Sequence, residues 1–239
     1  MLDETLLRSR IDHVRQSLET ASEGRFPPPR LIAVTKTHPV EMILPLEGMG
    51  VSDVGENHVQ EIVAKREFIK EKFRIHLIGR LQTNKVKYII EDVCLIHSLD
   101  RLPLAWEIDK QAQKRGVVMP VLVQVSPAGE EQKGGMAPEL IRPFLREVRQ
   151  MPGLHVEGLM AVMPHTDDEA YLSGLFRDMR CLFEQLREEA IPNVEMRELS
   201  MGMSGDYLLA ARHGATMVRV GSAIFGQRHY PNAQTQEEK

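Results

Sequence analysis

LIAVTK (residues 31–36) places a short apolar segment directly before a primary amine. The four apolar residues and Thr35 predict one buried β-strand, because unbroken apolar runs of this length are typical of strands that are covered on both faces. Lys36 then stands at the carboxyl end of that strand. This position matters, since parallel α/β folds form their binding sites at the carboxyl ends of strands.

Seven more strand-like runs follow, with amphipathic helical stretches between them. The complete set spans residues 31–35, 50–55, 74–79, 93–98, 118–126, 155–163, 193–201 and 216–222. Strand and helix alternate eight times in a chain slightly shorter than the ~250 residues typical of closed parallel barrels. The sequence therefore predicts an α/β fold, a single (β/α)8 TIM barrel. A doubly wound open sheet is the alternative, but TKTHPV (residues 35–40) lacks its glycine-rich first turn.

The whole chain, residues 1–239, is expected to form this one barrel domain. Apolar residues at helical spacing predict an N-terminal helix over residues 3–21, within a segment 1–25 that the proline-rich GRFPPPR (residues 24–30) ends: Leu7, Ile11, Val14 and Leu18. The last residues, 229–239, read as a loose polar tail. We expect no added C-terminal domain.

The composition excludes several classes of partner. Thirty basic and 34 acidic residues give a net charge of −4, so no overall basic field attracts nucleic acid or an anionic membrane. No stretch approaches the ~20 apolar residues that span a bilayer, and the polar start MLDETLLRSR is unlike a signal peptide. We therefore expect a cytoplasmic protein. Cys94 and Cys181 have no disulfide or zinc spacing and are expected to be small core residues.

The barrel prediction brings polar residues from distant segments to one mouth. They lie at or near the carboxyl ends of the predicted strands: Lys36, Asn57, His76, Ser98, Ser200, Ser204 and Arg219. SMGMSGD (residues 200–206) and VRVGSAIFG (residues 218–226) add small and hydroxyl residues whose backbone amides can reach an anion. A lysine at such a mouth, desolvated and near other cations, has a depressed pKa and can attack an aldehyde. Lysine, phosphate site and barrel together suggest pyridoxal 5'-phosphate (PLP).

Each signal also has a purely structural interpretation. A lysine at a strand end is usually a solvated or paired surface group. GMSG (residues 202–205) is equally consistent with a tight turn and a helix cap at Ser204. Arg219 is consistent with an ion pair among the strands, and His76 with a core histidine whose hydrogen bonds are satisfied. Gly202-Met203-Ser204-Gly205 lacks the G-x-S-x-G pattern of a serine hydrolase, and ENHVQE (residues 56–61) is not the HExxH of a zinc protease.

Seven segments, in order and spacing, resemble the pyridoxal phosphate homeostasis protein family over about residues 10–228. They are LIAVTKTHP, GENHVQE, HLIGRLQTNKVK, HSLDR, EGLMAVMP, ELSMGMSGDY and GATMVRVGSAIFGQR. The resemblance implies a barrel similar to the N-terminal domain of alanine racemase, with PLP held as an aldimine on Lys36. It also implies that Ser204, Gly221 and Ser222 hold the phosphate and that Arg219 faces the pyridine nitrogen.

The same resemblance places Asn57 and His76 beside the cofactor and Ser200 and Met160 in the pocket lining. It implies no metal. One position departs from the family, since Ser126 stands where the family has an asparagine after the fifth strand.

The chemistry expected of this site is cofactor binding with little or no catalysis. An arginine at the ring nitrogen is permanently protonated and leaves that nitrogen neutral, which makes the ring a poorer electron sink. We expect a monomeric carrier or regulator of intracellular PLP, with PLP-dependent apoenzymes as its possible recipients. The alternative is a PLP-dependent amino-acid racemase or lyase, for which His76 is the candidate second base. A third hypothesis, an RNA- or protein-binding module, rests on the short basic run GRLQTNKVK (residues 79–87).

Overall fold

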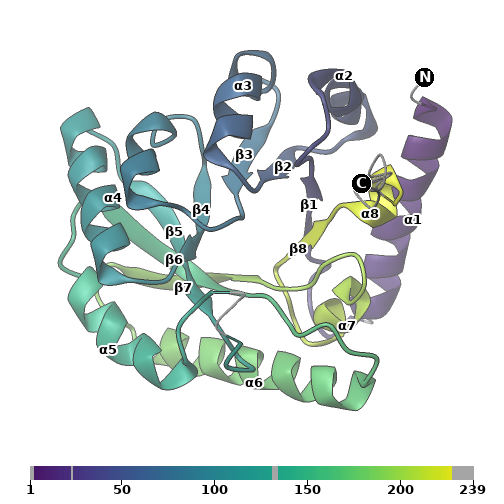
Figure 1. The fold of residues 1–239 in the computed structure, drawn as a ribbon. Coiled ribbons are helices and arrows are strands. Elements are labelled where there is room, and N and C mark those ends of the chain that lie inside the picture. Colours follow the sequence, from purple (N-terminus) through teal and green to yellow (C-terminus); the bar gives the residue numbers. More distant parts are fainter. Residues whose placement is uncertain (1–2, 23, 131–133, 228–239) are drawn as a thin grey trace, which may run out of the picture.

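Eight parallel strands close into a barrel in the order of the chain, as the sequence predicts (Figure 1). The computed structural model describes residues 3–22, 24–130 and 134–227. The strands are β1 (Arg30–Val34), β2 (Asp53–Glu56), β3 (Arg74–Leu77), β4 (Leu95–Leu99), β5 (Met119–Val125), β6 (Leu154–Ala161), β7 (Val194–Ser200) and β8 (Met217–Val220). Each overlaps one predicted run. The predicted tail, 229–239, lies outside the described residues.

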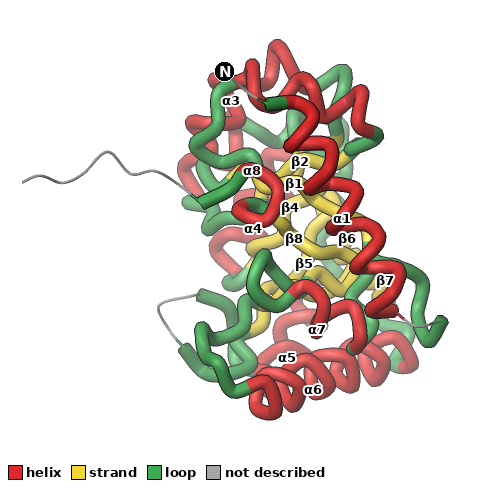
Figure 2. The backbone as a smooth tube through the Cα atoms, turned by 90° about the vertical axis from the view of Figure 1, so that its right-hand side faces the viewer, coloured by secondary structure: helices red, strands yellow, loops and turns green. Residues whose placement is uncertain are grey.

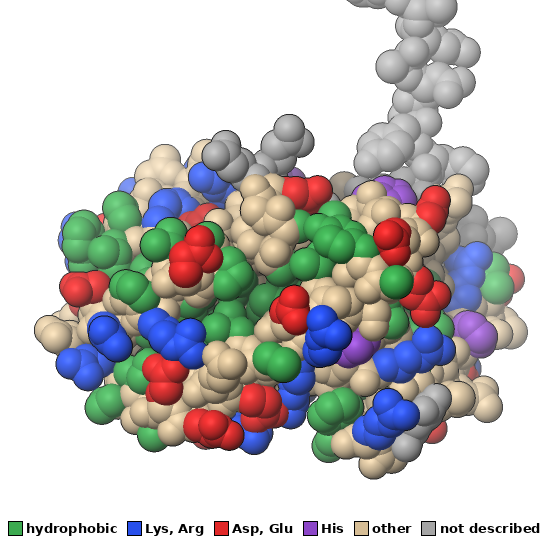
Figure 3. Space-filling view, turned by 90° about the horizontal axis from the view of Figure 1, so that it is seen from below, with side chains coloured by type: hydrophobic (Ala, Val, Ile, Leu, Met, Phe, Trp, Pro, Cys, Tyr) green, Lys and Arg blue, Asp and Glu red, His purple; other side chains and the backbone are tan. Residues whose placement is uncertain are grey.

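Helices surround the strands on the outside of the barrel (Figure 2). They are α1 (Glu4–Ser22), α2 (Val40–Ile43), α3 (Val59–Ile69), α4 (Leu102–Arg115), α5 (Pro138–Val148), α6 (Glu169–Glu188), α7 (Tyr207–Arg212) and α8 (Ser222–Phe225), with 3-10 helices η1 (Leu44–Met49) and η2 (Thr83–Tyr88). Among the described residues, none of these helices combines the length and apolar character that crossing a bilayer requires. On the face over α5 and α6, acidic and basic side chains are interspersed with hydrophobic ones (Figure 3).

The pairing of β8 with β1 closes the barrel. Ile32 lies opposite Arg219 and Ala33 opposite Val220 in a parallel register. The carboxyl ends of the first and last strands therefore meet, although almost 190 residues separate them in sequence, the interval between Ile32 and Arg219. This closure places the lysine of the first strand beside the loops of the last two.

Helix α1 covers the barrel where α8 is too short to do so, and it lies beside α7 and α8 (Figure 1). Its buried face includes Leu7, Ile11, Val14 and Leu18, the residues that predicted the helix. Two arginines fix it in place. Arg10 Nη1 donates to the Ile224 carbonyl over 3.3 Å, and Arg15 donates to the Met49 and Gly50 carbonyls over 2.8 and 2.6 Å.

A glycine allows β6 and β7 to approach each other. The register between the two strands shifts around Gly158, whose φ is 149°. A Cβ atom at this position would lie 1.8 Å from the Glu198 carbonyl oxygen, a backbone atom that has no freedom to move aside. The sequence therefore requires glycine here for packing.

Gly158→Ala is expected to destabilise the barrel by about 3 kcal/mol or more, since the added methyl group meets backbone. Gly174→Ala, in the middle of α6, is the matched control. A Cβ there has no neighbour within 4 Å, so this substitution should stabilise the protein by about 0.5–1 kcal/mol. Urea unfolding of both variants measures the difference, and equal effects would contradict this account of β6 and β7.

Candidate functional site

Lys36 sits in a tight turn that follows β1. The His38 N–H donates to the Thr35 carbonyl over 3.1 Å, so Lys36 and Thr37 are the two central residues of the turn. Thr37 has a φ of 66°, in the left-handed region that β-branched residues rarely adopt. The turn is strained, and contacts from outside it are needed to maintain this conformation.

Helix α3 supplies those contacts on both sides of Lys36. Lys65 Nζ donates to the Thr35 carbonyl over 3.0 Å, and the Thr37 N–H donates to Glu61 Oε2 over 2.6 Å. Lys65 and Glu61 also form an ion pair, with 3.1 Å between Nζ and Oε2. The conformation of the Lys36 turn therefore depends on two side chains that lie one helical turn apart.

Glu56 completes this network at the carboxyl end of β2. Its side chain is fully buried, and Oε1 accepts from Lys65 Nζ over 2.8 Å and from the Thr35 hydroxyl over 2.7 Å. Within the described residues, its other oxygen, Oε2, is buried without a hydrogen-bond partner. Burial raises the pKa of Glu56 to about 7, because the loss of solvation outweighs the Lys65 charge and the Thr35 hydrogen bond.

The Lys36 turn opens onto a cavity of about 500 Å³ at the carboxyl ends of β1 and β8. The cavity brings together five of the predicted binding residues: Lys36, Ser204, Arg219, Gly221 and Ser222. The other residues of its lining are Val34, Met203, Gly205 and Gln227. Its size lies within the range of small-molecule sites.

The loop after β7 and the start of α8 form one end of this cavity. The Ser204 hydroxyl accepts from the Gly221 N–H over 3.1 Å and from the Ala223 N–H over 3.3 Å. Both N–H groups belong to the type of backbone donor that binds anions. Gly221 also lets β1 approach, since a Cβ at this position would lie 3.3 Å from Val34 Cβ.

Arg219 lines the same cavity from the barrel interior and is only 4% exposed. Its Nη1 donates to Ser200 Oγ over 2.6 Å and its Nη2 to the Ala161 carbonyl over 2.8 Å. Burial lowers the pKa of Arg219 to about 10, and the Asp206 carboxylate opposes this shift. The guanidinium therefore stays protonated at neutral pH and is held in a fixed orientation.

The other four predicted site residues do not line this cavity. Ser200 is buried and reaches it through Arg219. His76 is fully buried, with both ring nitrogens hydrogen-bonded to Asp53 and His97. Met160 packs in a small apolar cluster inside the barrel, and the Asn57 backbone lies against Gly79.

Sequence reasoning missed five polar residues that support this site: Asp53, Glu56, Glu61, Lys65 and His97. A signal for three of them was present, because GENHVQE contains both glutamates and HSLDR begins with the histidine. Lys65 reads as an ordinary helix-surface lysine, yet only 9% of its side chain is exposed. Its burial follows from the packing of α3 on β2 and β3, which periodicity does not specify.

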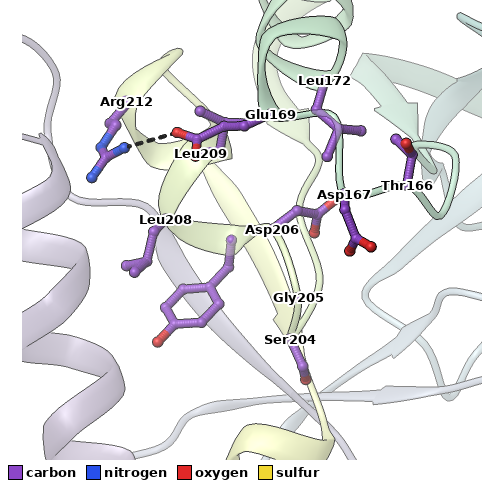
Figure 4. Close-up of a pocket in the computed structure, with 11 residues that line it drawn as sticks. Thr166, Asp167, Glu169, Leu172, Ser204, Gly205, Asp206, Leu208, Leu209 and Arg212 are labelled. Atoms are coloured by element: carbon purple, nitrogen blue, oxygen red, sulfur yellow. Dashed lines mark ion pairs between the residues drawn. The ribbon is translucent and has the colours of Figure 1, made fainter.

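An adjoining cavity of about 460 Å³ shares Ser204 and Gly205 with the first (Figure 4). The Arg212 and Glu169 side chains pair across its far side, with 3.6 Å between Nη1 and Oε1. Asp206 fixes the loop between the cavities, since its Oδ1 accepts from the Met203 N–H over 2.6 Å. The loop that carries Ser204 is thus ordered by its own hydrogen bonds.

The fold and the position of the cavity define the general class of this chain. Residues 8–229 match the family described as the alanine racemase N-terminal domain. An alanine racemase from Clostridium difficile has the same fold, with a TM-score of 0.77 and 18% sequence identity, over 95% of this chain and 57% of that chain.

Several relatives match almost the whole chain. A pyridoxal phosphate homeostasis protein of Aquifex aeolicus is 41% identical over 92% of this chain and 96% of its own length, and one of Schizosaccharomyces pombe is 33% identical over 93% of each. The structure of PipY from Synechococcus elongatus with PLP bound has a TM-score of 0.80 and 32% identity, over 92% of this chain and all of that one. The chain therefore belongs to the pyridoxal phosphate homeostasis protein family.

Lys65→Met is expected to destabilise the protein by about 3–5 kcal/mol, since it leaves the buried Glu56 carboxyl without its cationic partner. It should also weaken ligand binding at Lys36, because the turn loses one of its two anchors. Lys70→Met, at the residue that directly follows α3, is the control. Lys70 is 3.7 Å from Glu67 in an exposed pair, so its loss should change the free energy of unfolding by at most about 1 kcal/mol. Similar urea midpoints for the two variants would refute the anchoring role.

Glu56→Gln should change how stability depends on pH. The folded pKa of Glu56 is raised from 4.5 to about 7, so between these values the folded chain holds a proton that the unfolded chain has released. The stability that the Glu56 proton contributes to the folded state is fully present below pH 4.5 and is lost as pH rises through about 7. Relative to Glu56→Gln, the wild type should become less stable across this range in urea titrations. Glu139→Gln, at an exposed site on α5, should retain the wild-type slope, and a flat difference for Glu56→Gln would exclude its titration.

Proposed function

We propose that this chain binds PLP covalently through Lys36 and acts in intracellular PLP homeostasis as a carrier or regulator. The observation that carries the proposal is the single cavity that brings Lys36, the Ser204 loop and Arg219 together. PLP supplies an aldehyde that a lysine amine captures and a ring that withdraws electrons. The described residues would act as one PLP-binding domain.

The residues of the cavity fit the three parts of this cofactor. Lys36 provides the amine, and the Ser204 hydroxyl, which accepts from the N–H groups of Gly221 and Ala223, can donate its own hydrogen to a phosphate. Ser222 lies on the same lining. Arg219 provides a fixed donor for the pyridine nitrogen.

The remaining predicted binding residues take less direct roles in this proposal. Ser200 would act through Arg219, to which it is hydrogen-bonded. Contacts of Asn57, His76 and Met160 with the cofactor stay predictions from the family resemblance.

The lining of the cavity supports a carrier over a racemase or lyase. Racemisation at an α-carbon needs an acid or base on each face of the substrate. Among the described residues that line the cavity, Lys36 and Arg219 are the only ones with titratable side chains. His76, the candidate second base, is fully buried and uses both ring nitrogens inside the barrel.

The charge of the protein bears on its partners. We propose a cytoplasmic monomer that hands PLP to PLP-dependent apoenzymes and binds no nucleic acid. The net charge of −4 and the mixed charges on the face over α5 and α6 give no sign of a polyanion-binding surface (Figure 3). The basic segment 79–87 contributes instead to a separate polar cavity that also contains His58 and Arg101.

The test is the visible absorption of the protein loaded with PLP, followed by borohydride reduction and peptide mass mapping. The wild type should show the band of lysine-bound PLP and carry the reduced adduct on the peptide that contains Lys36. Lys36→Ala should lose both, whereas Lys70→Ala, at an exposed lysine of the neighbouring helix, should retain them. An adduct on another lysine, or a band that survives in Lys36→Ala, would overturn the assignment.

A further inference from the structure

A chain of hydrogen bonds crosses the barrel interior and ends at Arg219. It runs through Asp53 on β2, His76 on β3, His97 on β4 and Ser200 on β7. The successive distances are 2.9 Å from Asp53 Oδ1 to His76 Nε2, 3.0 Å from His76 Nδ1 to His97 Nε2, 3.0 Å from His97 Nδ1 to Ser200 Oγ, and 2.6 Å from Ser200 Oγ to Arg219 Nη1. All five side chains are at most 4% exposed.

When both imidazoles are neutral, Arg219 at one end and Asp53 at the other determine the direction in which the hydrogen bonds are donated. A guanidinium only donates, so Ser200 Oγ accepts from Arg219 and is free to donate its own hydrogen to His97 Nδ1. His97 then carries its proton on Nε2 and donates to His76 Nδ1. His76 carries its proton on Nε2 and donates to the Asp53 carboxylate, which only accepts. Every bond therefore points from the cation to the anion.

This direction solves an electrostatic problem for Arg219. A buried cation is costly unless it is paired, and no carboxylate is hydrogen-bonded to Arg219 within the described residues. The chain connects it to the buried carboxylate of Asp53 through aligned dipoles, which polarise one another in a low-dielectric interior. Asp53 thus adds a counter-charge through hydrogen bonds, while the Asp206 carboxylate acts on Arg219 through its charge alone.

We propose that Asp53, His76, His97 and Ser200 are positioning residues that fix the orientation of Arg219 and set the strength of its hydrogen bond to the cofactor. The proposal rests on the proposed function, in which Arg219 faces the pyridine nitrogen of PLP. It adds that the strength with which the PLP ring withdraws electrons depends on the protonation of the side chains from Asp53 to Ser200, as well as on Arg219 itself.

These five side chains can also be linked by a second arrangement of protons, in which His76 is charged. If His76 gains a proton, its Nδ1–H donates to His97 Nε2, and His97 Nδ1–H then donates to Ser200 Oγ. The Ser200 oxygen would then accept from both His97 and Arg219, and its hydrogen would lose its acceptor. One added proton near β2 and β3 therefore changes the hydrogen bonding at Arg219.

The charged groups around the chain favour a neutral His97 and a proton-accepting His76. Burial lowers the pKa of His97 well below its usual value, and the charges of His76, Arg219 and Arg30 add to this effect. Burial alone would lower the pKa of His76 as well, but its hydrogen bonds to Asp53 and Cys94 and their charges outweigh burial and raise it.

The Asp53 end of the hydrogen-bonded series lies beside a partly exposed arginine, although Asp53 itself is buried. The Asp53 pKa is lowered, because hydrogen bonds from His76 and Ser52 and the charges of His76 and Arg74 together outweigh burial. Arg74 Nε lies 3.7 Å from Asp53 Oδ1, and about half of the Arg74 side chain is exposed. Solvent around Arg74 therefore lies close to the Asp53 carboxylate.

The first test needs no cofactor. Nitrogen-15 NMR of the cofactor-free protein at alkaline pH, above the raised pKa of His76, should show His76 and His97 as neutral imidazoles that each carry the proton on Nε2. A charged His97, or an Nδ1–H form of either ring, would overturn the direction of the chain. This result stands whether or not the protein binds PLP.

The second test uses the PLP-loaded protein. Asp53→Asn should shift the pH midpoint of the visible absorption band by at least half a unit, a threefold change in the proton equilibrium, because the counter-charge of Arg219 is lost. Glu195→Gln is the matched control, since this exposed carboxylate on β7 pairs with His155 and Arg197 and stands outside the series. Identical titrations for Asp53→Asn and wild type would overturn the positioning role, whereas failure of the wild type to bind PLP would refute the proposed function alone.

A pair of substitutions at His97 separates positioning from packing. His97→Gln can still donate toward His76 and accept from Ser200, so it should keep the wild-type titration. His97→Leu fills the space but breaks the chain, and its titration should shift as that of Asp53→Asn does. Equal spectra for the two variants would contradict the proposal.

Discussion

Closure of the sheet between β1 and β8 is the constraint on which the rest of the structure depends. The register that pairs Ile32 with Arg219 sets the carboxyl ends of the two strands side by side. Lys36 and Gly221 each follow one of these ends, so the amine and the backbone amides share one cavity only because the barrel is closed. An open sheet built from the same strands would leave β1 and β8 on separate edges and would have no such site.

Two buried polar systems then refine what closure brings together. On one side of the mouth, Glu56, Glu61 and Lys65 hold the strained turn that presents Lys36. Inside the barrel, hydrogen bonds hold Arg219 in a single orientation. Both systems place polar groups in the interior, where apolar side chains of similar size would often give equal or greater stability. The polar groups instead hold the Lys36 amine and the Arg219 guanidinium in fixed positions.

The sequence was sufficient to predict the eight-stranded barrel and five of the residues that line the cavity at its mouth, because strand periodicity and the carboxyl-end rule are properties of single segments. It was not sufficient for contacts across the interior. Whether His97 meets His76 or Ser200 depends on the stagger between strands, which no single segment encodes. His76 has both ring nitrogens satisfied in the core, the structural interpretation that its apolar neighbours favoured. The hydrogen-bonded series from Asp53 to Arg219 could therefore be recognised only once the register between the strands was known.

The position of helix α1 has a consequence for how the chain is made. Helix α1 is synthesised before every strand of the barrel, yet it packs on α7 and α8, which follow β7 and β8, and its Arg10 bonds to the Ile224 carbonyl. Contacts of such long sequence separation form late and slow folding. A nascent chain must therefore carry an unsatisfied amphipathic helix until nearly all of the barrel has emerged, which makes that helix a natural substrate for chaperones during translation.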